Sequence, residues 1–347
     1  MNIAFFISDH GYGHIMRNLP VMKELTKRGH NIVVVCGKRH IEIAREYLEE
    51  AVYIEFHTDA GLVVKPGTLI VDKEATASAV NGYVSEFPER ISLAKSIIKE
   101  YSIGAVVADI VPWALLVAKQ LSIPSFLMAS FTWIEQYESF VNDEDLNVLR
   151  EAFQTTEQVL YYDLVNKPTS DLLGSGIDVG FVAREFQVDE VIRIKNEHKR
   201  PIVFISLGGS NSGLNFEIDV SSLPYDFIST CALKLKGTNV TYLDASVPNS
   251  QDYVKAADFC IAKAGWSTVS EMMLAGVKFG VLTRPDVPED TMIIEELGKR
   301  QAAIAINVEE LKDMGKVMDK LEKYDFSQIC YENNYKKIAS IVTRIEL

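Results

Sequence analysis

Residues 257–285 read ADFCIAKAGWSTVSEMMLAGVKFGVLTRP, and this stretch decides the fold class. The apolar run 259–262 is typical of a parallel strand that is buried on both faces. A turn at 263–265 then leads into a helix, which Gly276 ends. Residues 279–282 are apolar again and predict the next parallel strand. The stretch therefore predicts consecutive strand, helix and strand elements of an α/β domain.

The predicted start of this helix suits an anion. A helix N-terminus at the carboxyl end of a parallel strand has free N–H groups and about half a positive charge, which favours phosphate. Gly265 would let an anion approach the backbone, Ser267 and Thr268 add hydroxyl donors, and Lys263 adds a cation. Glu271 has two interpretations: it accepts hydrogen bonds from a ribose diol, or it completes a capping box with Thr268.

The same stretch resembles the nucleotide-sugar signature of two-domain GT-B glycosyltransferases. The similarity is carried by Gly265-Trp266-Ser267-Thr268 with Glu271 six residues after the glycine, followed by Ala275-Gly276-Val277 and Pro285. The resemblance implies that the glycine and the hydroxyl residues hold the donor diphosphate and that Glu271 holds the ribose.

Some positions depart from the family pattern. Lys263 stands where the family often has His, Ser267 where it often has Asn, and Lys278 where Pro is usual. The sugar-binding pair of the family, an acidic residue and Gln, corresponds here to Glu289-Asp290. The identity of the sugar therefore stays open.

The chain begins with an apolar strand at 3–7, a glycine-rich turn and a predicted helix at 17–27. This order opens a nucleotide-binding type of α/β domain. Gly11 and Gly13 lie in the turn and are predicted to line the acceptor side together with Arg17. Two interpretations apply to Arg17, which either contacts an anionic group or is solvated on the helix.

His14 and Asp109 are the predicted catalytic residues. Asp109 follows a predicted strand at 104–108, so both residues fall at the carboxyl edge of the same sheet. A neutral imidazole oriented by a carboxylate can take the proton of an acceptor hydroxyl. In GT-B transferases of the plant type, the His of a Gly-His pair after the first strand is the base and a later Asp of the same domain orients it. Gly13-His14 and Asp109 resemble that arrangement.

Each catalytic candidate also has a structural alternative. His14 would then only bond the backbone, and Asp109 would cap the helix that begins near 112. His10, on the same loop, is a weaker candidate for the base. The loop also resembles the Gly-His-Ile/Val-x-Arg motif of nucleotide-sugar hydrolases, in which water replaces the acceptor.

A second glycine-rich turn follows the predicted strand at 201–207. It reads Gly208-Gly209-Ser210-Asn211-Ser212-Gly213. Such a turn forms a backbone nest for phosphate or approaches the donor sugar closely. We therefore assign Gly208, Gly209 and Ser210 to donor binding, together with the residues that follow the strand at 259–262.

Strands and helices alternate along the whole chain, which predicts α/β architecture with doubly wound parallel sheets. The resemblance implies two Rossmann-like domains facing each other across a cleft. We expect an acceptor-side domain at 1–185 and a nucleotide-sugar domain at 186–330, joined within 174–200. We expect the last helix, in 331–347, to pack back on the first domain.

Composition limits the partners. The 347 residues carry a net charge of −13, which argues against nucleic acid as the main partner. No apolar run approaches the ~20 residues of a membrane helix and no leader is evident, so we expect a cytoplasmic protein with at most peripheral membrane association. No Cys/His metal spacing appears, and Asn142-Asp143-Glu144-Asp145 fits the acidic first turn of a helix better than a metal motif.

Together these features predict metal-independent transfer of a sugar from a nucleoside diphosphate donor, with UDP favoured, to an unknown acceptor hydroxyl. No cofactor is expected beyond this co-substrate. The resemblance extends to family 1 and family 28 type transferases, such as the peptidoglycan N-acetylglucosaminyl transferase, and to the glycosyltransferase-like half of plant arabinose kinases. The alternatives are a nucleotide-sugar hydrolase of the nonulosonic acid type and a non-catalytic nucleotide-sugar-binding protein.

Overall fold

The computed structural model describes residues 1–207, 214, 216–230, 233–244, 247–284, 286–327 and 329–344. The chain forms two compact units. The first comprises residues Met1–Val63, Asp72–Val182 and Asn333–Leu347, and the second Val64–Val71 and Ala183–Glu332. The segment Val64–Val71 was not expected in the second unit; its Leu69 is part of the apolar core there.

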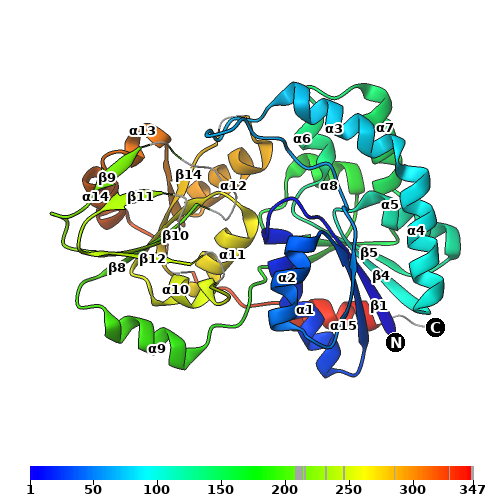
Figure 1. Cartoon of the computed structure of the whole chain (residues 1–347), viewed down its shortest axis with the longest axis horizontal. Helices are drawn as coiled ribbons and strands as arrows, with labels where there is room; N and C mark the ends of the chain where they lie inside the picture. Colours follow the sequence, from blue (N-terminus) through cyan, green and yellow to red (C-terminus); the bar gives the residue numbers. More distant parts are fainter. Residues whose placement is uncertain are drawn as a thin grey trace. The chain divides into compact units, whose positions relative to one another are not determined.

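The first unit contains a parallel sheet in the order β3-β2-β1-β4-β5-β6-β7 (Figure 1). The order of the strands reverses between β1 and β4, and ligands of doubly wound sheets bind at the carboxyl ends of the strands at such a reversal. Its strands are β1 (Asn2–Ile7), β2 (Asn31–Cys36), β3 (Val52–Glu55), β4 (Ile103–Asp109), β5 (Ser125–Ala129), β6 (Gln158–Tyr162) and β7 (Ile177–Gly180).

Helices cover both faces of this sheet (Figure 1). In β1, Ala4 and Phe6 belong to the core cluster that also contains Trp113 of α5, and the rings of Phe6 and Trp113 lie 5.3 Å apart. The helices of the first unit are α1 (Gly13–Lys27), α2 (Lys38–Tyr47), α3 (Lys73–Ser85), α4 (Phe87–Glu100), α5 (Pro112–Leu121), α6 (Trp133–Tyr137), α7 (Asp143–Phe153), α8 (Lys167–Leu173) and α15 (Tyr335–Thr343).

Two helices of the first unit begin away from their predicted starts. Helix α1 starts at Gly13 rather than near 17, so His14 lies in its first turn. The last helix, expected from about 327, starts only at Tyr335 as α15. The backbone N–H of Asn334, just before it, donates to Phe181 O at 3.0 Å. Helix α15 packs against α1, where Arg28 Nη1 donates to Ser340 Oγ at 2.8 Å.

The second unit repeats the strand order of the first. Its main sheet runs β12-β10-β8-β13-β14-β15, all parallel, and the order reverses between β8 and β13. The α/β prediction is therefore confirmed in both units. These strands are β8 (Ile202–Ser206), β10 (Asp226–Thr230), β12 (Val240–Leu243), β13 (Phe259–Lys263), β14 (Lys278–Leu282) and β15 (Ala303–Ile306).

Smaller elements complete the second unit. A parallel pair, β9 (Glu217–Asp219) and β11 (Lys234–Lys236), lies outside the main sheet. The helices are α9 (Val188–Glu197), α10 (Ser250–Ala256), α11 (Trp266–Ala275), α12 (Pro288–Lys299), α13 (Val308–Leu311) and α14 (Met314–Lys323).

The predicted strands at 259–262 and 279–282 are confirmed as β13 and β14. Gly276 ends α11 with a φ of +66°, as a C-terminal glycine should. The predicted capping box is wrong, because α11 begins at Trp266 with Gly265 as its N-cap and has no side-chain cap. Thr268 and Glu271 therefore lie inside the helix, in its first two turns.

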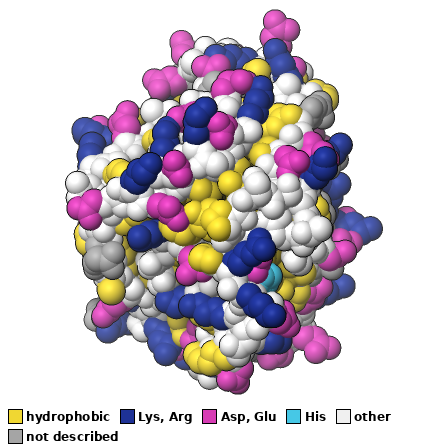
Figure 2. All heavy atoms as spheres, turned by 90° about the vertical axis from the view of Figure 1, so that its left-hand side faces the viewer, with side chains coloured by type: hydrophobic (Ala, Val, Ile, Leu, Met, Phe, Trp, Pro, Cys, Tyr) yellow, Lys and Arg dark blue, Asp and Glu magenta, His cyan; other side chains and the backbone are white. Residues whose placement is uncertain are grey.

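Acidic and basic side chains are interspersed with apolar ones on the face shown in Figure 2. In the described part of the chain, no helix is both long enough and apolar enough to span a membrane.

Candidate active site

The structure brings His14 and Asp109 together at the strand reversal of the first unit. His14 is the second residue of α1, and Asp109 is the last residue of β4. Their Nδ1 and Oδ1 atoms are 2.9 Å apart. The backbone N–H of Ser8, just after β1, donates to Asp109 O at 3.2 Å, which ties the loop before α1 to the end of β4.

Asp109 is fully buried and accepts hydrogen bonds from three side chains. Besides His14, Arg17 binds both carboxylate oxygens, with Nε 2.7 Å from Oδ2, and Asn18 Nδ2 lies 2.5 Å from Oδ2. Burial raises the pKa of this carboxyl, but the charges and hydrogen bonds of Arg17 and His14 outweigh burial and hold the pKa well below its usual range. Asp109 is therefore ionised, and the alternative that it caps α5 is wrong, because Val111 is the N-cap.

Arg17 is only 2% exposed, so the interpretation that it is solvated on the helix is wrong. Its Nη1 donates to Ser130 Oγ at 3.2 Å, and its guanidinium lies 4.6 Å from the centre of the Tyr162 ring. Arg17 contacts an anionic group, the carboxylate of Asp109, which is 92 positions away in the sequence. Its place on the acceptor side stays a prediction.

The surroundings of His14 favour its neutral form. Burial lowers its pKa most, the charge of Asp109 opposes this, and the charge of Arg17 lowers the pKa further. Its Nδ1 atom lies 2.9 Å from Asp109 Oδ1 and 3.0 Å from Arg17 Nη2. A proton on Nδ1 suits the contact with Asp109 and leaves the lone pair on Nε2, whereas the contact with Arg17 suits a lone pair on Nδ1. The edge of the ring meets Phe131, with the ring centres 5.9 Å apart.

The backbone of the turn before α1 requires glycine at position 11. Gly11 has a φ of +75°, and its carbonyl accepts a hydrogen bond from His40 Nε2 at 2.8 Å. Gly13 is the first residue of α1. His10 packs its ring edge against Trp133, and its Nδ1 lies 3.3 Å from the N–H of Leu62. These contacts favour a packing role for His10.

In the second unit, four predicted donor residues surround the start of α11. Lys263, Gly265, Ser267 and Thr268 are all half-buried, and the space beside Gly265 is open. Trp266 differs, because it is 2% exposed and belongs to the core. This arrangement leaves backbone, hydroxyl groups and a cation accessible at one helix start, as an anion site requires.

Lys263 has an unusual electrostatic environment. Burial and the charge of Arg284 lower the pKa of its ammonium group to about 8, while Asp290 opposes the shift. Lys263 is opposite Leu282 in the register of β13 and β14, and Arg284 follows two residues later. Two cationic side chains therefore lie at neighbouring strand ends.

Glu271 is 7% exposed and forms an ion pair with Arg184. Arg184 Nη2 and Nε lie 2.8 Å and 3.3 Å from Oε1 of Glu271. The sequence placed Arg184 only within the expected link at 174–200, because nothing local connects two residues that are 87 positions apart.

The two residues of the acidic pair Glu289-Asp290 differ in burial. Asp290 is 1% exposed and bound by Arg284, with Nε 2.7 Å from Oδ2 and Nη2 bonded to Oδ1. Its carboxylate therefore holds Arg284, contrary to the expectation that it contacts the donor sugar. Glu289 is half-buried.

Some predicted residues cannot be placed. Gly208, Gly209, Ser210 and Pro285 lie outside the described residues. Among the residues that are described, no group of three or more His, Cys, Asp or Glu side chains is arranged to hold a metal ion.

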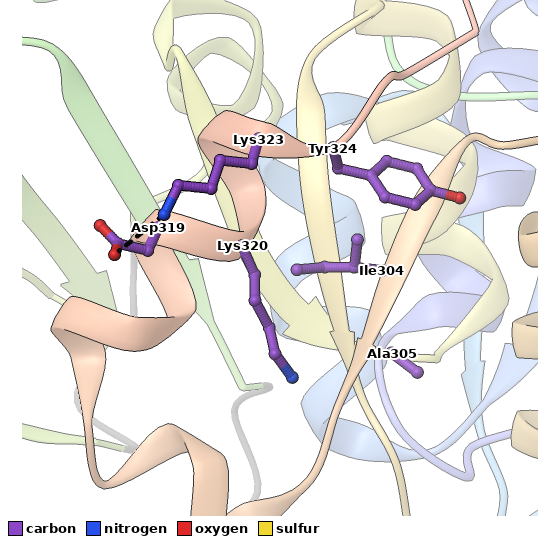
Figure 3. A pocket seen from close by; sticks show the side chains of 6 residues that line it. All are labelled: Ile304, Ala305, Asp319, Lys320, Lys323 and Tyr324. Carbon is purple, nitrogen blue, oxygen red and sulfur yellow. Dashed lines mark hydrogen bonds and ion pairs between the residues drawn. The ribbon is translucent and has the colours of Figure 1, made fainter.

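A pocket of about 440 Å³ lies elsewhere in the second unit, between β15 and α14 (Figure 3). The ion pair of Lys323 and Asp319, at 3.4 Å, is at its wall. The lining residues are Ile304, Ala305, Asp319, Lys320, Lys323 and Tyr324, and none of them is a predicted donor residue.

Comparison with known proteins agrees with this architecture. Residues 1–152 match the family model described as glycosyl transferase family 1. The chain is 26% identical to L-arabinokinase of Arabidopsis thaliana, over 95% of this chain but only 32% of that protein. It is 23% identical to an uncharacterized glycosyltransferase of Methanosarcina mazei, over 86% of this chain and 84% of the relative.

Solved structures extend the similarity over the whole chain. The glycotransferase of kitacinnamycin has a TM-score of 0.65 at 15% identity, covering 99% of this chain and 98% of that one. UGT89C1 of Arabidopsis thaliana, complexed with UDP, has a TM-score of 0.59 at 12% identity and covers 100% of both chains. The two repeated sheets thus define the class as the GT-B fold. The first 152 residues match a glycosyltransferase family model, and the whole chain shares the GT-B fold.

Proposed function

We propose that the protein transfers a sugar from a nucleoside diphosphate donor, with UDP favoured, to an acceptor hydroxyl without a metal ion. The buried pair of His14 and Asp109 carries this proposal, because a neutral imidazole held by an ionised carboxylate is a base for an alcohol. UDP is favoured because UGT89C1, which shares the fold, was solved with UDP. The proposal concerns this chain alone, which spans about a third of L-arabinokinase.

The reaction is a single displacement at the anomeric carbon. The acceptor oxygen forms a bond to that carbon as its proton moves to Nε2 of His14. The bond from the carbon to the diphosphate oxygen breaks, and the diphosphate leaves with the electron pair. Asp109 stabilises the imidazolium that results, and one displacement inverts the anomeric configuration.

The start of α11 would receive the diphosphate leaving group. Gly265, Ser267 and Thr268 present backbone and hydroxyl donors, and Lys263 supplies a positive charge. Together with the positive end of the helix dipole, these groups would neutralise the charge that develops on the leaving group. Glu271 lies further along the same helix and would receive the ribose.

The test is a transfer assay with a panel of UDP-sugars and alcohol acceptors. We expect wild type to form a glycoside and His14→Ala to lose at least about 100-fold in kcat, the usual size of a general-base effect. His198→Ala, in the second unit, is the matched control and should keep wild-type turnover. Full activity of His14→Ala with an identified acceptor would refute the role of His14.

The same assay separates the two alternatives. Free sugar and nucleotide released without an acceptor would identify a hydrolase. Nucleotide-sugar binding without any turnover, despite many acceptors, would identify a non-catalytic binding protein.

A further inference from the structure

We propose that Arg184 is a positioning residue that orients Glu271 for the ribose diol of the donor. This inference rests on the proposed donor function. It assigns a role to an arginine that lies outside the signature of the donor site.

The ion pair of Arg184 and Glu271 uses only one carboxylate oxygen of Glu271. Both hydrogen bonds from Arg184 to Glu271 end on Oε1, at 2.8 Å from Nη2 and 3.3 Å from Nε. No hydrogen bond to Oε2 is found within the described part of the chain. One carboxylate oxygen is therefore fixed by the protein, while the other keeps its capacity to accept hydrogen bonds.

Arg184 is itself held from several sides. Its Nη1 donates to Pro248 O at 2.5 Å, and its Nη2 donates to Ser250 Oγ at 3.0 Å. These partners belong to the turn before α10 and to its first residue. A guanidinium with partners in different directions cannot rotate freely, so it fixes the direction of the carboxylate that it binds.

Burial explains why the carboxylate needs this partner. Arg184 is 5% exposed and Glu271 is 7% exposed. An ionised carboxylate is costly at such burial unless a cation and hydrogen bonds compensate it. Arg184 provides the positive charge and the hydrogen bonds at Oε1 of Glu271. The second oxygen, Oε2, then serves as a charged acceptor for a ligand.

A vicinal diol fits that acceptor. The two hydroxyls of a ribose can both donate to one carboxylate, and hydrogen bonds to a charged group are stronger than neutral ones. A dideoxyribose has no hydroxyl to donate, so the site should distinguish the two sugars of the nucleotide by about 10- to 100-fold in Kd.

The experiment compares the Kd values of UDP and of 2′,3′-dideoxy-UDP by calorimetry. We expect wild type to prefer UDP by about 10- to 100-fold and Glu271→Ala to lose this preference. Arg184→Met should reduce the preference to within about threefold, with the Kd of the dideoxy nucleotide nearly unchanged. Arg193→Met, on the exposed face of α9, is the control and should behave as wild type.

If Arg184→Met fails to fold, Arg184→Lys tests the inference in its place. Lysine keeps the charge but not the planar fork, so the preference should fall at least about threefold. Two outcomes overturn the inference: a folded Arg184 variant that keeps the full preference, or one that weakens both nucleotides equally. If wild type binds neither nucleotide, the proposed function itself is wrong, which is a different result.

Discussion

At the scale of single residues, the first unit concentrates its polar contacts on one carboxylate. Asp109 accepts from His14, Arg17 and Asn18, and all four residues are buried. The sequence indicated His14 and Asp109 because they follow two strands whose carboxyl ends meet. It could not indicate the roles of Arg17 and Arg184, because their acidic partners are 92 and 87 positions away.

Asp109→Asn tests this arrangement. The amide cannot accept as many hydrogen bonds and cannot balance the charge of Arg17, so we expect kcat to fall by about 10²- to 10⁴-fold. Removing one partner of a buried ion pair should also lower the free energy of unfolding by about 3–5 kcal/mol. Enzyme kinetics and urea unfolding measure the two effects. Asp178→Asn, at an exposed position of β7, should change neither, and a loss of kcat below tenfold in Asp109→Asn would contradict the assigned role.

Lys263 predicts a pH dependence of donor binding. Its pKa is lowered from 10.5 to about 8, and a bound diphosphate favours the protonated form. Affinity for UDP should therefore fall as the pH rises through 8, by about tenfold at pH 9. The folded protein releases the Lys263 proton at a lower pH than the unfolded chain, whose pKa is 10.5. Without ligand, the free energy of unfolding should therefore rise as the pH rises from about 8 to 10.5.

Calorimetry at pH 7 and pH 9 measures this effect. Lys263→Gln should bind UDP more weakly at pH 7 and show little change between the two pH values. A wild-type Kd that is the same at both pH values would show that Lys263 does not contact the anion.

At the scale of elements, apolar runs predicted the strands well. The runs at 259–262 and 279–282 became β13 and β14, because a strand buried on both faces leaves a continuous apolar signal. The turn at 263–265 into α11 agrees with the prediction, but the capping box of Thr268 and Glu271 is wrong, because Gly265 is the N-cap and Thr268 lies inside the helix. The spacing of a capping box alone cannot show which residue is the N-cap.

A substitution at Gly280 in β14 tests the packing of the main sheet of the second unit. A Cβ at this position would lie 2.3 Å from Ile306 Cδ1, a side chain that is itself 1% exposed. Gly280→Ala should therefore lower the free energy of unfolding by about 1–3 kcal/mol. Gly298→Ala is the matched control in α12, where nothing lies within 4 Å, and it should raise stability by about 0.5–1 kcal/mol. Equal effects of the two changes in urea unfolding would contradict the close packing at β14.

At the scale of the whole molecule, the two units share one strand order. In each, the sheet reverses at the edge where the predicted site residues lie: β1 and β4 carry His14 and Asp109, and β13 leads into the start of α11. Alternating elements made the α/β class predictable. The place of Val64–Val71 in the second unit was not predictable, because Leu69 is buried there by residues that are distant in the sequence.

The central claim is that the second unit binds a nucleoside diphosphate at the start of α11. The most direct test is the melting temperature of the wild type and of Glu271→Ala with a panel of nucleoside diphosphates and their sugars. At 100 times its Kd, one nucleotide family should stabilise wild type by about 2.7 kcal/mol, and clearly less in Glu271→Ala at the same concentration. If no nucleotide or nucleotide sugar raises the melting temperature of the wild type, the claim is contradicted and only the fold is shared with the nucleotide-sugar enzymes.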